Sequence, residues 1–377
     1  MVVGKRVAMV AVACAVLVTI PVRAARAQVP ETGNRATGEQ IYNEACAACH
    51  GRDGRGNPSA VVGFDVALPD FTDCVFATVE SAEGWHAVVH EGGPVRALDR
   101  HMPAFGDALS DEEIDLAVSH VRTFCKNQRA YPQGDLNLPR PLVTEKAFPE
   151  NEAVYTMGFS RDAGHAVSNG FVYERRIGAR YQYEVNVPFD VQQSGANEPW
   201  AHGLGDVAVA LKRVMYHDVR KGTIFSIGEE IGLPTGKESQ GLGSGVTTFE
   251  SWAAFGQVLP AMSFVQFHTG IGIPSNSELA AKEAFWRAAI GKTFTAPKFG
   301  RIWTPMVEVV GAREIVSGAV NEWDVIPQMQ VSLSKRRHVL VSGGMQLPLN
   351  QRDERKPQVL AYLIWDWYEG GLFDGWK

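Results

Sequence analysis

The stretch Tyr181-Gln182-Tyr183-Glu184-Val185-Asn186-Val187-Pro188-Phe189-Asp190-Val191 decides the fold of the larger part of this chain. Apolar and aromatic residues alternate with polar ones along it. Because successive side chains of a β-strand point to opposite faces, the pattern predicts a strand with one apolar and one polar face. Strands of soluble proteins usually have five or six residues, whereas membrane-spanning strands have about 9–11. The length of the stretch therefore favours a strand that crosses a membrane.

The same period of two recurs towards the C-terminus. It is clear at 322–333 and noisier at 204–214, 223–233, 261–273, 301–312, 338–350 and 358–368. We therefore expect residues 152–377 to form an antiparallel, transmembrane β-barrel of the outer-membrane type, with about 12 strands. The polar alternates would then face a wet lumen: Glu184, Asn186, Asp190, Glu308, Asp324, Gln328 and Gln330.

Tryptophan is concentrated in the same part of the chain. Eight of the nine residues follow position 150, and several stand near expected strand ends, where membrane barrels carry aromatic girdles. They are Trp200, Trp252, Trp286, Trp303, Trp323, Trp365, Trp367 and Trp376. A soluble β-sandwich or a ligand-binding barrel stays open as the alternative, because its strands alternate in the same way.

The N-terminus has the pattern of a secretory signal peptide. Lys5 and Arg6 precede an apolar run over residues 7–20, and Ala25-Arg26-Ala27 forms a small-residue cleavage site. We expect residues 1–27 to be removed, so that the mature protein is exported. A membrane-anchoring helix is the alternative, but the run is shorter than the ~20 residues that a spanning helix needs.

Residues 28–128 hold a motif for covalent haem attachment. Cys46-Ala47-Ala48-Cys49-His50 has the C-x-x-C-H spacing. Two thiols one helical turn apart can reach the two vinyl groups of one porphyrin, and the adjacent His50 imidazole can bind the iron. A redox or zinc-binding C-x-x-C is the alternative. For the second axial ligand we expect Met102, whose thioether favours ferrous iron; its neighbour His101 is the competitor, with His90 and His86 further away. One covalent haem c follows.

The other cysteines suggest a disulfide. Cys14 lies in the predicted signal peptide, which leaves Cys74 and Cys125 as an even pair in an exported chain. We expect them to be bridged; two buried free thiols are the alternative. Helix starts are indicated in the same region by capping residues at Thr37, Ser81 and Ser110.

Residues 129–151 change character. Pro132, Pro139, Pro141 and Pro149 interrupt any regular element. The pattern predicts a proline-rich linker, or a segment that wraps around a neighbouring domain.

Residues 36–126 resemble a class I cytochrome c. The similarity runs through C-A-A-C-H, G-R-G-N-P, L-P-D-F, W-H-A-V-V-H-E-G-G, M-P-A-F, L-S-D-E-E-I and V-R-T-F. It implies that the Pro58 carbonyl orients His50 and that Trp85 lines the haem pocket, although Trp85 could equally be a core residue. His120 departs from the family, since many members carry an aromatic residue there. The resemblance implies an electron carrier and no enzyme, because a six-coordinate iron has no open position for substrate.

A second resemblance concerns the expected barrel. Gly203-Leu204-Gly205-Asp206, Leu233-Pro234-Thr235-Gly236-Lys237 and Gly241-Leu242-Gly243-Ser244-Gly245 look like motifs of the outer-membrane barrel family named for phenol meta-pathway proteins. That family implies a roughly twelve-stranded barrel through which small hydrophobic molecules pass.

Together these features predict a c-type cytochrome that carries electrons at the cell envelope and is tethered to an outer-membrane barrel. An even number of strands would place both barrel ends, and the haem domain, at the periplasmic side. Its partners would be periplasmic redox proteins and outer-membrane lipid. The alternatives are a transporter of small hydrophobic solutes with an accessory haem domain, and a soluble periplasmic redox module. The net charge of −6 and the absence of basic runs argue against nucleic-acid binding.

Overall fold

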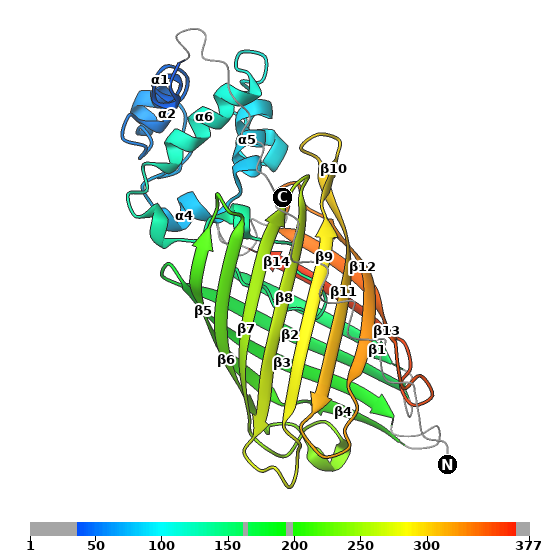
Figure 1. The fold of residues 1–377 in the computed structure, drawn as a ribbon. Coiled ribbons are helices and arrows are strands. Elements are labelled where there is room, and N and C mark those ends of the chain that lie inside the picture. The colour runs from blue at the N-terminus through cyan, green and yellow to red at the C-terminus, as the bar shows by residue number, and fades with distance from the viewer. Residues whose placement is uncertain (1–35, 161–164, 194–198, 367–377) are drawn as a thin grey trace, which may run out of the picture. The chain divides into compact units, whose positions relative to one another are not determined.

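A computed structural model describes residues 36–160, 165–193 and 199–366 (Figure 1). The predicted signal peptide, residues 1–27, lies outside this part, as do Trp367 and Trp376. The helices lie before residue 137, apart from η5 (Glu238–Gln240), and the strands lie from residue 152 onwards. The helices before residue 137 are α1 (Gly38–Ile41), η1 (Tyr42–Cys46), α2 (Ala47–His50), α3 (Ser59–Val62), α4 (Cys74–Val79), α5 (Ala82–Glu91), η2 (Gly93–Arg96), α6 (Asp111–Arg122), η3 (Gln128–Ala130) and η4 (Gly134–Leu136).

The predicted capping residues start three of the helices. Thr37 and Ser110 form capping boxes with Gln40 and Glu113 at the start of α1 and α6, and the Ser81 side chain accepts from a backbone N–H of α5. Such side chains satisfy N–H groups that have no partner inside the helix. No helix in the described ranges is both long enough and apolar enough to span a bilayer.

A disulfide joins two of these elements. Cys74 opens α4 and Cys125 follows α6; their Cα atoms are 5.0 Å apart and the sequence separation is 51. The structure therefore contains the pair expected from the cysteine count, and Cys46 and Cys49 are left as free thiols.

The rest of the described chain is one antiparallel sheet closed into a barrel. Its strands are β1 (Glu152–Ser160), β2 (His165–Ile177), β3 (Tyr181–Gln193), β4 (Trp200–Leu204), β5 (Val207–Asp218), β6 (Thr223–Leu233), β7 (Thr248–Leu259), β8 (Ser263–Pro274), β9 (Glu283–Lys292), β10 (Phe294–Ala296), β11 (Arg301–Glu314), β12 (Glu322–Ser332), β13 (Val339–Pro348) and β14 (Gln358–Asp366).

The wall consists of twelve staves, where a stave is one strand or two consecutive strands that run in line. The short strands β4 and β10 pair with β3 and β11 and continue β5 and β9, so the fourteen strands form twelve staves. The sheet closes because β1 pairs with β14 as well as with β2. The register sets Glu152 opposite Asp366, so the first stave begins at the rim where the last one ends. This confirms the predicted antiparallel barrel of about 12 strands.

The two faces of the wall show why the barrel is of the outer-membrane type. Apolar side chains such as Phe171, Ile227 and Phe267 are 50%, 42% and 50% exposed on the outside. The opposite face buries polar side chains, among them Glu308 and Gln330. Soluble barrels bury apolar residues and expose polar ones, so this arrangement excludes the soluble alternative and suits a lipid surround.

The tryptophans do not all follow the girdle prediction. Trp200 and Trp303 are about half exposed on the outside, as expected. Trp252, however, is 8% exposed and packs in the apolar cluster that also contains Phe148 and Phe285. Trp252 is therefore not one of the girdle residues, because the register of β7 turns it inwards.

The glycine-rich motifs of the barrel converge on one carboxylate. Asp206 accepts hydrogen bonds from the Gly236 N–H at 2.9 Å, and from the Ser244 N–H and hydroxyl at 2.7 Å each. Gly236 is required because an added Cβ would come within 2.2 Å of the Leu242 carbonyl oxygen. These residues therefore hold a loop between β6 and β7 in place.

Candidate haem site and the barrel interior

The C-x-x-C-H motif lies where a short irregular helix passes into α2. Residues 42–46 form a π-helical turn, a feature that is frequent at functional sites. The Tyr42 hydroxyl donates to the Gly51 carbonyl oxygen at 2.7 Å, and the Asn57 amide donates to the Ala48 carbonyl oxygen at 2.9 Å. These two bonds fix both ends of α2. Cys46, Cys49 and His50 are thereby held on adjacent turns.

Burial favours the neutral forms of Cys46 and His50. It raises the pKa of the Cys46 thiol to about 11, with a smaller contribution from Cys49. It lowers the pKa of His50, which favours the neutral imidazole that binds metals. His50 Nδ1 is buried and has no hydrogen-bond partner among the described residues. An orphaned imidazole nitrogen beside two free thiols fits a covalently attached haem.

Aromatic rings form a wall beside this motif. The Phe71 ring lies 5.0 Å from that of His50, and Trp85 lies 5.6 Å from Phe71. Trp85 and Cys46 pack against the same buried cluster, which includes Tyr42 and Phe71. The structure thus brings Trp85 to the motif. Phe71 was not singled out from the sequence; the L-P-D-F motif was the only available signal.

Pro58 lies near the motif but is used differently from the expectation. Its carbonyl accepts from the N–H groups of Val61 and Val62, at 2.8 and 3.2 Å, and so starts α3. No hydrogen bond joins it to His50 in the described part of the chain. A contact between Pro58 and a bound haem stays a prediction.

Met102 belongs to a separate loop after η2. Its carbonyl accepts from the Gly93 N–H at 3.0 Å, and its own N–H donates to the Asp99 carbonyl at 3.2 Å. Side chains at positions 92 and 93 would collide with this loop: a Cβ on Gly93 would lie 2.2 Å from the Asp99 oxygen and 3.2 Å from the Met102 Cβ. The glycine pair therefore allows the loop to pack closely against the end of α5.

The competing ligand, His101, is already engaged. Its N–H and its ring Nδ1 contact the Asp99 carboxylate at 2.9 and 2.6 Å, which lowers the pKa of Asp99. Its ring also stacks on Phe64 with a centroid distance of 4.4 Å. Among the described residues, these contacts leave the ring Nε2 of His101 open, so the choice of Met102 as the second iron ligand stays a prediction.

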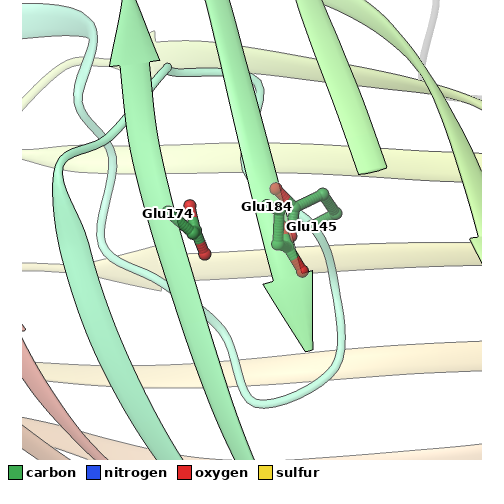
Figure 2. Close-up of side chains that lie close together, drawn as sticks. All are labelled: Glu145, Glu174 and Glu184. Atoms are coloured by element: carbon green, nitrogen blue, oxygen red, sulfur yellow. The ribbon is translucent and has the colours of Figure 1, made fainter. Parts of the chain in front are cut away.

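The second group of functional interest is inside the barrel. Residues 134–150, which we call the inner segment, bring Glu145 to the wall residues Glu174 and Glu184 (Figure 2). Carboxylate oxygens of the three lie within 4.8 Å of one another. Cations already accompany them, because Lys212 Nζ lies 2.8 Å from Glu145 and Arg140 pairs with Glu174. The cluster is thus part of an ion-pair network.

A comparison with models of protein families matches the N-terminal part of the chain. Residues 33–121 match the family model described as cytochrome C oxidase, cbb3-type, subunit III. None of the curated proteins compared matches the sequence. The N-terminal part is accordingly a cytochrome c domain.

Solved structures similar to the barrel include bacterial porins. A KdgM porin in complex with disordered oligogalacturonate is 10% identical, with 57% of this chain and 99% of that chain covered and a TM-score of 0.37. A NanC porin is 7% identical, with 57% and 98% covered and a TM-score of 0.39. LpxR from Salmonella typhimurium is 11% identical, with 57% and 100% covered and a TM-score of 0.37. The phenol meta-pathway family stays a prediction.

Proposed function

We propose that this protein is a monohaem c-type cytochrome that transfers single electrons at the cell envelope and is anchored in the outer membrane by its barrel. The observation that carries the proposal is His50, a partly buried imidazole with a lowered pKa, directly after two free thiols one helical turn apart. The protein acts as an electron carrier and not as an enzyme.

The residues of the haem domain would have separate tasks. Cys46 and Cys49 would form thioether bonds to the haem, and His50 and Met102 would bind its iron. A bound haem supplies one-electron iron chemistry. Phe71 and Trp85 would exclude water from it, which tunes the reduction potential.

The anchored state follows from the apolar outer face of the barrel. We expect the haem domain to face the periplasm, where c-type haem is attached, and to exchange electrons with periplasmic redox proteins. Both ends of the barrel wall lie at one rim, at Glu152 and Asp366, which supports this orientation of an exported chain.

A haem-stained gel of separated membranes tests the proposal. Haem stain in the outer-membrane fraction, on a band that shifts between unboiled and boiled samples, is the expected result. The matched control replaces Cys46 and Cys49 by Ala, which should remove the stain and keep the heat shift. Stain only in the soluble periplasm would refute the anchor, and an unstained wild-type band would refute the haem.

A further inference from the structure

We propose that the inner segment, residues 134–150, is a plug that closes the lumen, so that the barrel is an anchor and not an open pore. The inference does not depend on the haem. The prolines of this stretch suggested a linker. In the structure, however, its side chains and backbone groups contact residues of the barrel wall.

The inner segment meets every stave of the barrel. A chain that contacts the whole circumference of a closed wall must cross the lumen. Its partners around the wall are Glu152 (β1), Glu174 (β2), Gln182 (β3), Lys212 (β5), Ser226 (β6), Gly256 (β7), Gln266 (β8), Arg287 (β9), Glu308 (β11), Gln330 (β12), Gly344 (β13) and Tyr362 (β14).

Glu308 accepts several hydrogen bonds from the inner segment. Its carboxylate accepts from the backbone N–H groups of Leu142, Val143 and Thr144 at 2.7, 3.1 and 2.7 Å. The Thr144 hydroxyl donates to it at 2.7 Å as well. Successive N–H groups around one anion form a strong site, and Glu308 is fully buried. This residue fixes the middle of the inner segment to the wall.

Arg140 fixes the part of the inner segment that precedes Leu142. Its guanidinium pairs with Glu174, and with Glu152 at 2.9 Å. Its carbonyl accepts from the Tyr362 hydroxyl. Removal of the segment would leave buried carboxylates on the wall without a counter-charge, which is costly.

Apolar side chains also pack the inner segment against the wall. Leu136 and Phe148 are 1% and 2% exposed and belong to a cluster with Ile224, Trp252 and Phe285 of the wall. An open aqueous channel would not be lined in this way, because apolar side chains packed together exclude water. Glycines at positions 256 and 344 leave room for the segment: a Cβ there would come within 2.9 and 2.7 Å of Leu138 and Leu142.

Conductance of the full-length protein in a planar lipid bilayer tests the plug. Wild type should show no channel steps. Glu308→Ala should give steps or a noisy leak, and a variant with residues 138–148 replaced by a Gly/Ser stretch of equal length should conduct steadily. Glu314→Ala is the matched control, since it removes a carboxylate from the same strand at a position outside the inner segment's contacts.

Each outcome decides the question. Steps in the Gly/Ser variant with a silent wild type and a silent Glu314→Ala control support the plug, whether or not Glu308→Ala folds. Wild-type conductance equal to that of the Gly/Ser variant overturns it. So does a silent Gly/Ser variant whose heat-shifted band shows that the barrel has folded, because something other than the inner segment would then close the lumen.

Discussion

Removal of the Cys74–Cys125 disulfide offers a direct measure of what stabilises the haem domain. The bond closes a loop over a sequence separation of 51. A crosslink acts mainly by reducing the conformational entropy of the unfolded chain, and loop closure over this separation corresponds to about 4 kcal/mol at 25 °C. Replacing both cysteines by Ala should therefore lower the free energy of unfolding of the domain by about that amount.

The effect should be large enough to read from a denaturation midpoint. For a domain of this size the dependence of unfolding free energy on guanidinium concentration is about 2–4 kcal/mol per molar, so the midpoint should fall by about 1–2 M. Absorbance of the bound haem follows this domain alone, which matters because a two-domain chain does not unfold in one step.

A reductant supplies the control. With the iron held ferrous in all samples, a phosphine reductant should lower the midpoint of wild type and leave that of the double Ala variant unchanged. Equal midpoints for wild type and the double variant would show that the loop-closure argument does not apply here. A shift of the double variant on reduction would show that the reductant acts elsewhere.

Three further changes test other parts of the structure. Met102→His should lower the midpoint potential and abolish the sulfur-to-iron absorption band, since imidazole favours ferric iron more than thioether does. A midpoint potential equal to that of wild type in a potentiometric titration would show that another residue binds the iron. Arg140→Gln should destabilise the barrel by about 3–5 kcal/mol, because Glu152 and Glu174 lose their counter-charge; this is read as a lower temperature for the gel shift, and an unchanged temperature would contradict the buried network. Asp206→Ala should expose residues 234–246 to protease without changing the haem spectrum, because Gly236 and Ser244 lose their acceptor; a resistant loop would show that Asp206 is dispensable.

The features that could be predicted from the sequence depend on local patterns. The C-x-x-C-H motif, the capping boxes at Thr37 and Ser110, and the cysteine pair all involve residues whose roles are encoded within a few positions or by simple counting. The alternation along Tyr181–Val191 likewise predicts a strand whatever its neighbours are. These patterns were enough to predict a helical haem domain, a β-barrel and the candidate haem ligands.

The interior of the barrel could not be predicted in this way. Residues 134–150 carry no periodicity, and their prolines are equally typical of a linker. Their structure is set by partners far along the chain, such as Glu308, which is 164 residues from Thr144. The inward facing of Trp252 could not be predicted for a related reason: the facing of a strand residue depends on register, and a noisy alternation does not fix the register.

The contacts that residues 134–150 make with all twelve staves also constrain how such a protein can change over evolutionary time. A single inserted residue in any stave reverses the facing of every side chain beyond it. An insertion in β11 before Glu308, for example, would turn this carboxylate towards lipid and remove the acceptor of three backbone N–H groups at once. Length variation among descendants of this sequence should therefore collect in the turns, while the staves keep their lengths and accept only substitutions.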